Sequence, residues 1–129
     1  MIKSLFLLIL FSFSPATVEK TYFKNYFENG NLKSEGWISQ NQKVDYWYYY
    51  YENGTKKSEG HFEANKKINW WLFYNQNGTI EKKVEFKNNI QEGLCLIYKN
   101  GDLVKGEQFT KGIKTKEWNS ISAYKEDNP

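Results

Sequence analysis

The sequence is poor in the side chains that carry most enzyme and metal chemistry. Its 129 residues include one histidine, His61, and one cysteine, Cys95. A single imidazole cannot form a histidine metal cluster or pass a proton to a second imidazole. Cys95 has no partner for an intramolecular disulfide, so the fold must hold without that cross-link. The sequence shows no phosphate-binding loop or nucleophile elbow, and we expect no catalytic residues, no metal and no cofactor.

An excess of charge of one sign is also lacking. The formal net charge is only +3 at pH 7, and lysines and acidic residues are interleaved along the chain. This balance argues against nucleic-acid binding, which needs a basic patch, although it permits contact with an acidic surface. Aromatic residues, in contrast, make up 19% of the chain and charged residues 26%, a combination that suits half-buried β-strands.

The one long apolar run lies at the N-terminus, in "MIKSLFLLILFSFSPA". Lys3 precedes the run Leu5–Phe11, and Pro15-Ala16 ends it with small residues, which is the pattern of a secretory signal peptide. The alternative is a buried N-terminal helix. No cysteine follows the run to carry a lipoprotein anchor. We therefore expect residues 1–16 to be removed near Ala16 and the mature chain to reach the periplasm, cell envelope or extracellular space.

The rest of the chain repeats itself. Residues 26–36 read "YFENGNLKSEG" and residues 50–60 read "YYENGTKKSEG". Asn-Gly recurs at spacings of 24, 24 and 23 residues, and a second series and a third share this period. The three series are Asn29-Gly30, Asn53-Gly54, Asn77-Gly78 and Asn100-Gly101; Ile38, Phe62, Phe86 and Phe109; and Trp47, Trp71, Cys95 and Trp118. The period predicts about four units over residues 17–124, with one deletion between Cys95 and Asn100 and a tail at 125–129.

Each unit is predicted to be two antiparallel strands with two tight turns. Asn-Gly between alternating apolar runs favours a type I′ hairpin turn, in which both residues have positive φ. A second polar turn follows in each unit, such as "SQNQK" at residues 39–43. Residues 17–129 show no convincing 3.6-residue apolar period, so we expect almost no helix. The fold class is an all-β antiparallel meander of roughly eight strands, built from stacked β-hairpins in a single sheet.

The alternation of side chains along the strands assigns two faces. Identical positions of successive units should stack across the sheet. The predicted repeat core consists of Leu32, Ile38, Trp47, Phe62, Trp71, Phe86, Cys95, Phe109 and Trp118. The opposite face carries a candidate interaction surface of Tyr46, Tyr48, Tyr50, Trp70, Leu72 and Tyr74. A single sheet that is apolar on both sides must curl on itself or present one side to something else.

The phrase "YxENGxxKSEG" followed by "WYYYYENG" resembles the MORN-variant repeats of the bacterial YwqK-type antitoxin family. The resemblance covers about residues 22–124 and implies a repeat β-sheet with an interaction role, with a toxin as the partner if the antitoxin label applies. The family usually has glycine two residues before the tryptophan, where this chain has Asp45, Asn69 and Lys116, and only Gly93 matches. The glycine of "SEG", kept at Gly36 and Gly60, becomes Val84 and Glu107. The repeats therefore decay toward the C-terminus.

Two classes of function remain. The first is a non-catalytic module whose aromatic face binds another protein, because Tyr and Trp dominate interface energies. The second is an envelope module that lies against an anionic membrane or wall polymer, using the basic doublets Lys56-Lys57, Lys66-Lys67 and Lys82-Lys83. The simpler interpretation of the doublets is solubility and protection of the sheet.

Overall fold

The computed structural model describes residue 9 and residues 12–129. Most of the apolar run Leu5–Phe11, on which the prediction of export depends, lies outside the described residues. The described chain forms one sheet of nine antiparallel strands in sequence order, followed by a short helix. The elements are β1 (Thr21–Tyr26), β2 (Leu32–Ser39), β3 (Gln42–Tyr50), β4 (Lys56–Glu63), β5 (Lys66–Tyr74), β6 (Ile80–Lys87), β7 (Ile90–Lys99), β8 (Asp102–Thr110), β9 (Ile113–Trp118) and α1 (Ile121–Asp127).

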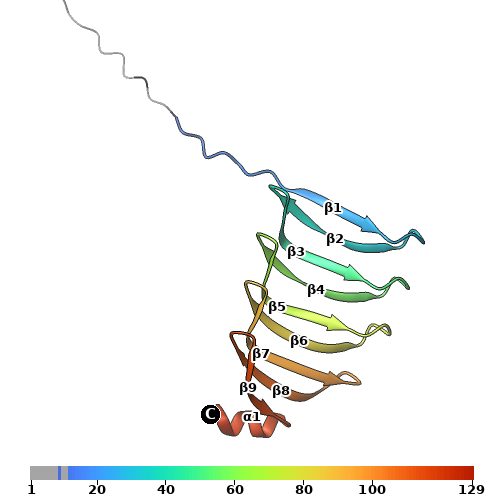
Figure 1. Cartoon of the computed structure of the whole chain (residues 1–129), viewed down its shortest axis with the longest axis vertical. Coiled ribbons are helices and arrows are strands. Elements are labelled where there is room, and N and C mark those ends of the chain that lie inside the picture. Colours follow the sequence, from blue (N-terminus) through green and yellow to red (C-terminus); the bar gives the residue numbers. More distant parts are fainter. Residues whose placement is uncertain (1–8, 10–11) are drawn as a thin grey trace, which may run out of the picture.

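The predicted antiparallel meander is confirmed. Hairpins stack along the long axis of the molecule, with β1 at one end of the sheet and β9 at the other (Figure 1). The sheet has one strand more than the roughly eight expected, and α1 is a single short helix, in agreement with the expectation of almost no helix, although its position was not predicted. This helix has seven residues, too few for an apolar period to appear, and Ser120 caps it by accepting a hydrogen bond of 3.0 Å from the Ala123 N–H. Among the described residues, no helix is long and apolar enough to cross a membrane.

The turn type predicted for Asn-Gly is wrong in three of the four hairpins. Gly30, Gly54 and Gly78 have positive φ, but the asparagines before them do not. In the first hairpin, the Gly30 N–H donates to the Phe27 carbonyl and the Phe27 N–H donates to the Asn31 carbonyl, which closes a three-residue loop. Such a loop is a type I turn followed by one left-handed residue. Only Asn100-Gly101 has both φ values positive, at 52° and 83°. Its loop is one residue shorter, which explains the spacing of 23.

The second turn of each unit, and not the Asn-Gly turn of the first three units, has the backbone conformation of a type I′ turn. Two residues with positive φ join the strands at Gln40-Asn41, Ala64-Asn65, Asn88-Asn89 and Lys111-Gly112. Two of these turns also clamp neighbouring units together. Asn65 bonds the Lys43 backbone through both its N–H (3.0 Å) and its side-chain oxygen (2.8 Å), and Asn89 repeats the contact with Lys67 at 2.9 and 2.7 Å.

One side of the sheet, which we call the tryptophan side, holds the core without a second layer to cover it. Successive strands place Gly36, Trp47, Gly60, Trp71, Val84, Cys95 and Glu107 directly opposite one another. Trp47 is 1% exposed and Trp71 is fully buried. Each indole occupies the space above a glycine of the preceding strand, where any β-carbon would overlap the ring. The absent side chains of Gly36 and Gly60 therefore create the sites in which these indoles are buried.

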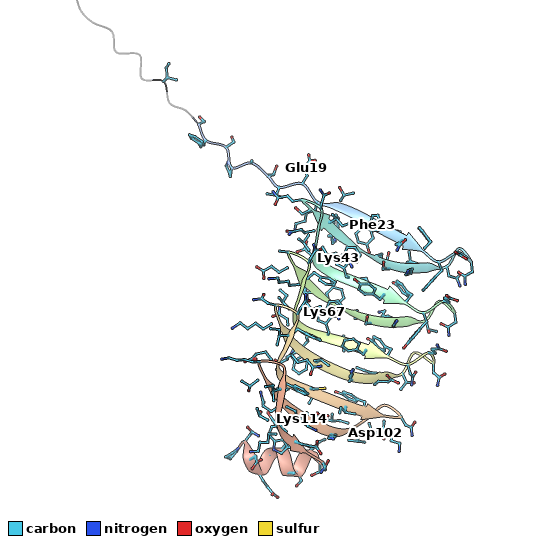
Figure 2. All side chains as sticks on the ribbon, in the orientation of Figure 1. Glu19, Phe23, Lys43, Lys67, Asp102 and Lys114 are labelled. Carbon is cyan, nitrogen blue, oxygen red and sulfur yellow. The ribbon has the colours of Figure 1, made fainter. Side chains whose placement is uncertain are left out.

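Lysine side chains lie over the aromatic rings of the tryptophan side. The Lys43 ammonium lies within 5.2 Å of the ring centroids of Trp47, Tyr49 and Phe62. One repeat later, Lys67 lies within 5.7 Å of the ring centroids of Trp71, Phe73 and Phe86. Figure 2 shows the two lysines at corresponding places on successive units. Burial lowers the pKa of Lys67, and the charges of Lys43 and Lys82 lower it further.

Eight of the nine predicted core residues are buried or half-buried on strands of the repeat, but the ninth, Trp118, lies on the other side of the sheet. Phe62 and Cys95 are buried like Trp47 and Trp71, whereas Leu32, Ile38, Phe86 and Phe109 are half-buried. Val84, which was not predicted, is also fully buried. Trp118 is buried as well, but opposite Gly106, whose own partner is Leu96. The prediction that Trp118 continues the line of Trp47 and Trp71 is therefore wrong.

A missing bulge residue explains the different face of Trp118. Asp45, Asn69 and Gly93 each have positive φ two residues before the core position of their strand. In β5, Asn69 and Trp70 have no paired residue on β4, so the bulge contains two residues. In β9, only Thr115 has no paired residue on β8. The residue equivalent to Asn69 is Lys116, which is not among the positive-φ residues of the described chain. A one-residue difference in register moves a side chain to the other face of a sheet.

Candidate interaction surface

The six residues proposed as an interaction surface lie together on the side of the sheet opposite the core. We call them the tyrosine face: Tyr46, Tyr48 and Tyr50 from β3, and Trp70, Leu72 and Tyr74 from β5. The register places Glu35, Tyr48, Glu59, Leu72, Lys83, Leu96, Gly106 and Trp118 opposite one another on successive strands. The tyrosine face is thus the central part of a continuous surface.

Aromatic rings of this surface are in contact and partly exposed. Tyr46 lies 5.1 Å from Tyr48 between ring centroids, and 4.9 Å from His61 on β4 in an edge-to-face arrangement. Trp70 is 38% exposed, in contrast to its sequence neighbour Trp71 on the core side. Trp37, at the His61 position one unit earlier, is 39% exposed and packs edge-on against Tyr22. The surface therefore presents two indoles to solvent.

Two carboxylates fix the orientation of the tyrosines. The Tyr46 hydroxyl donates to Glu59 Oε1 at 2.9 Å, and the Tyr50 hydroxyl donates to Glu35 Oε1 at 2.8 Å. Burial raises the pKa of both tyrosines, and the carboxylates raise it further, because an ionised phenol there would lose its hydrogen bond and face a negative charge. The phenols therefore stay protonated and donate charge-assisted hydrogen bonds, which hold the rings in place.

Lys56 joins this network at its centre. Its ammonium lies 2.6 Å from Glu59 Oε2 and over the rings of Tyr48 and Tyr74, at 5.0 and 5.9 Å from their centroids. The hydrogen bond to Glu59 raises the pKa of Lys56. Neither Glu35 nor Glu59 was predicted to belong to the surface, and the simpler interpretation of Lys56 was solubility and protection of the sheet. Glu35 and Glu59 are 24 residues apart, and this recurrence alongside the tyrosines was the sequence signal that could have placed them in the surface.

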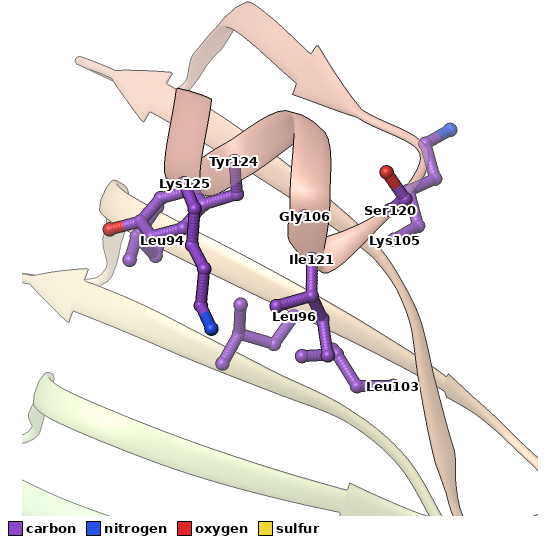
Figure 3. A pocket seen from close by; sticks show the side chains of 9 residues that line it. All are labelled: Leu94, Leu96, Leu103, Lys105, Gly106, Ser120, Ile121, Tyr124 and Lys125. Carbon is purple, nitrogen blue, oxygen red and sulfur yellow. The ribbon is translucent and has the colours of Figure 1, made fainter. Parts of the chain in front are cut away.

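The surface changes character toward the C-terminus, where α1 covers it. Tyr124 of the helix packs edge-on against Trp118 at 5.1 Å, and the Trp118 indole N–H donates to Asp127 at 2.6 Å. An apolar pocket of about 310 Å³ lies between the helix and β7–β8. Figure 3 shows the residues that line it: Leu94, Leu96, Leu103, Lys105, Gly106, Ser120, Ile121, Tyr124 and Lys125. Leu94 and Leu96 are the repeat equivalents of Trp70 and Leu72. The chain thus places a helix of its own over the last part of this surface.

The two chemically distinctive side chains lie in ordinary surroundings. His61 is exposed and contacts Tyr46. Cys95 is buried beneath the tryptophan side, and burial raises the pKa of its thiol, which disfavours the reactive thiolate. Among the described residues, no group of three or more histidine, cysteine or acidic side chains is placed to hold a metal ion.

The lysine doublets do not form a common basic rim. Lys82 lies over Phe73 on the tryptophan side, whereas Lys83 lies over Tyr98 on the opposite side. Lys56 is paired with Glu59, and Lys67 lies over the core rings. Adjacent paired residues of a strand point to opposite faces, so Lys82 and Lys83 divide their charge between the two sides.

Comparisons with models of protein families, with curated proteins and with solved structures give no match.

Proposed function

We propose that this chain is an exported, non-catalytic repeat protein of the MORN-variant type that binds another protein through the tyrosine face. The single observation that carries the proposal is the exposure of Trp70 within a set of rings whose orientations are fixed by hydrogen bonds. Rigid aromatic side chains lose little entropy on binding and supply most of the energy of protein interfaces.

The partner element that fits this surface is an amphipathic helix. α1 already shows how a helix meets the same side of the sheet, through Tyr124 against Trp118. The repeat gives Trp70 and Leu72 the strand positions of Leu94 and Leu96, which border α1 across the apolar pocket. A helix over β3–β6 would bury Trp70 while its polar side chains meet Glu59 and Lys56. A toxin that presents such a helix would make the protein an antitoxin or immunity-type binder.

Binding to an anionic membrane or wall polymer is the weaker proposal. It requires lysine charges that converge around the aromatic residues. Lys56 is paired with Glu59, and Lys82 and Lys83 lie on opposite sides of the sheet, so the charges are divided. This arrangement supports a protein partner over an anionic surface.

The test compares two adjacent tryptophans. Immobilised chain captures its partner from the cell envelope, the captured protein is purified, and its affinity is measured by titration calorimetry. Trp70→Ala should weaken the affinity by ~30-fold or more, about 2 kcal/mol, and should leave the melting temperature nearly unchanged. Trp71→Ala should instead destabilise the fold by ~3 kcal/mol, because it empties a buried position.

Flotation with anionic vesicles separates the two proposals. A protein-binding chain should remain at the bottom of the gradient and lose its partner with Trp70→Ala. If the chain instead floats with the vesicles in a salt-dependent manner and captures no protein, the proposal fails.

A further inference from the structure

The sheet has two edges, and only one of them is protected. Among the described strands, β1 pairs with β2 alone, so the main-chain groups along its outer edge have no described strand beside them. All six residues of β1 are exposed, including the large rings of Tyr22, Phe23 and Tyr26. Figure 2 shows Phe23 on this terminal strand. An aromatic edge strand of this kind is a template for pairing with another strand.

The opposite edge carries the features that prevent such pairing. On β9, Lys114 pairs with Glu117 at 2.7 Å and Lys116 pairs with Asp127 of α1 at 2.7 Å. α1 contacts both β8 and β9, and its Tyr124 packs against Trp118. Charged side chains and a covering helix are the usual means by which proteins blunt an edge strand. Within the described chain, β1 has no ion-pair network like that of β9: its one charged residue, Lys24, makes a single ion pair with Glu35 at 3.9 Å.

Comparison of β1 with the equivalent strand β3 shows the effect of the missing neighbouring strand. Phe23 stands 24 residues before Trp47 and is 45% exposed, whereas Trp47 is 1% exposed. The two residues occupy the same position in their units, and Phe23 lies opposite Gly36 just as Trp47 lies opposite Gly60. β3 differs in having a strand on each side. A strand added beside β1 would therefore restore the environment that the repeat provides elsewhere.

We propose that β1 is a dimerisation edge, at which two copies of this chain pair antiparallel about a two-fold axis through Phe23. An edge strand that meets its own copy forms an isologous interface, in which residue i contacts residue j and residue j contacts residue i. This register places Phe23 beside Phe23 of the second copy on the tryptophan side. It also places each Tyr22 beside Lys24 of the other copy on the opposite side, where a cation–π contact is favourable.

Charge selects this register over the nearest symmetric alternative. An axis through Lys24 would place Lys24 directly opposite its own copy, and like charges that are directly opposite destabilise a strand pair. With the axis through Phe23, each Lys24 lies opposite Tyr22 of the other copy, so the two lysines are offset by two residues along the strands. Dimerisation would join the two nine-stranded sheets into one, with both tyrosine faces on the same side. One strand pair is a small interface, so a reversible dimer with a micromolar dissociation constant is expected.

The first experiment measures mass against concentration by sedimentation equilibrium. It uses the full chain and a chain that begins at Thr17, which keeps all nine strands and α1. Both should move from monomer toward twice the monomer mass as concentration rises. Phe23→Lys places like charges together at the axis and should raise the dissociation constant at least 10-fold. The control is Ile113→Lys on the β9 edge, which replaces another exposed large apolar residue by the same charged one, and it should leave the dimer intact.

The second experiment tests the register by cross-linking. Directly opposite residues of antiparallel strands have Cα atoms about 4.5–5.5 Å apart, within the range of a disulfide. Phe23→Cys should therefore oxidise to a covalent dimer. Lys24→Cys should not, because its copy lies about 8 Å away, from the rise per residue and the strand spacing. The parent chain, whose only thiol is buried at Cys95, is the blank.

Three outcomes overturn the proposal. The first is a chain that stays monomeric at every concentration. The second is a dimer that Ile113→Lys dissociates and Phe23→Lys does not. The third is a covalent dimer that forms through position 24 in preference to position 23. None of these outcomes bears on the partner of the tyrosine face, which is tested with Trp70.

Discussion

The indole of Trp71 occupies the space directly above Gly60, so that any β-carbon at residue 60 would overlap the ring. Trp47 has the same relationship with Gly36 one unit earlier. A single-layered sheet cannot bury a tryptophan between two layers. This chain buries it by removing the side chain of the residue opposite, which lets the ring lie close against the backbone.

Gly60→Ala should therefore lower the free energy of unfolding by about 2–3 kcal/mol, because the indole must leave its site. The control is Gly106→Ala, whose β-carbon would lie 3.5 Å from the Trp118 ring, at ordinary contact distance. That substitution should cost less than about 1 kcal/mol. Urea unfolding of the two variants measures the difference, and equal losses would contradict the role given to Gly60.

Val84 and Cys95 are the matching pair of the third unit, with a larger residue in place of glycine and a smaller one in place of tryptophan. Cys95→Trp alone should destabilise the chain, because the side chain of Val84 occupies the space that the indole needs. Val84→Gly alone should destabilise it by removing a buried side chain. Together the two changes should recover part of the loss, with a coupling of about 1–3 kcal/mol in a double-mutant cycle. Simple additivity would mean that the two sites are independent.

Asn69 has a φ of 58°, a left-handed conformation that suits Asn and Gly but not β-branched residues. Asn69→Gly should leave stability unchanged or raise it slightly. Asn69→Val should lower it by about 1–3 kcal/mol, because valine must adopt a strained backbone there. Thermal unfolding monitored by tryptophan fluorescence provides the measurement. If both variants melted alike, the conformation of the bulge would not matter to the fold.

The hydroxyls of Tyr46 and Tyr50 should make the fold sensitive to alkali. Burial and the hydrogen bonds to Glu59 and Glu35 raise the pKa of both phenols above the ordinary value of 10.0. The folded state therefore holds these protons more tightly than the unfolded state, and their contribution is fully present below pH 10. It is lost as the pH rises through the folded pKa.

Urea unfolding as a function of pH checks this sign. The parent chain should lose stability above pH 10, and Tyr46→Phe with Tyr50→Phe should reduce the slope. Phenolate absorbance in the double variant should lose the component that titrates at the highest pH. An unchanged alkaline slope would show that these hydroxyls do not carry the effect.

The Lys67 side chain should stabilise the fold through its methylene groups rather than its charge. Burial lowers its pKa, which means that the aromatic surroundings do not fully replace the water lost by the ammonium. Lys67→Met keeps an apolar stem of similar length and should leave the stability at pH 7 equal or higher. Lys67→Ala uncovers the Trp71 ring and should cost about 1–2 kcal/mol. A loss with methionine as large as that with alanine would indicate that cation–π attraction dominates.

The fold followed from the sequence because three series of residues share one period and each unit contains two turn signals. The alternation of side chains along a strand placed Tyr46, Tyr48 and Tyr50 on one side and Trp47 on the other. Turn types were less accessible, since Asn-Gly suits both a two-residue loop and the left-handed position of a three-residue loop. Strand pairing around the loop decides between them, and that depends on residues such as Phe27 and Asn31 outside the dipeptide.

Two features of the surface could not be derived from the period. The first is the side occupied by Trp118, which depends on whether Lys116 adopts positive φ. Asp45, Asn69 and Lys116 all replace glycine at this position, but only the first two have positive φ. The second is the pairing of Tyr46 with Glu59 and of Tyr50 with Glu35, which are offset along their strands. Diagonal contacts of this kind follow from the twist of the sheet.

The tightened Asn100-Gly101 loop and the ordinary backbone of Lys116 have a consequence for how long the molecule can become. A repeating sheet has no intrinsic length, because each hairpin offers the next one the same surface. In the last unit Trp118 lies on the other side of the sheet, beside α1, so a further hairpin would not find the glycine groove, and its strand would meet the charged side chains of Lys114, Lys116 and Glu117. Whole units could be added only upstream, for example at the Ala64-Asn65 turn, with each 24-residue unit extending the sheet by about 10 Å. The last unit therefore disfavours extension beyond β9, and we expect any variation in the number of units to lie upstream of it.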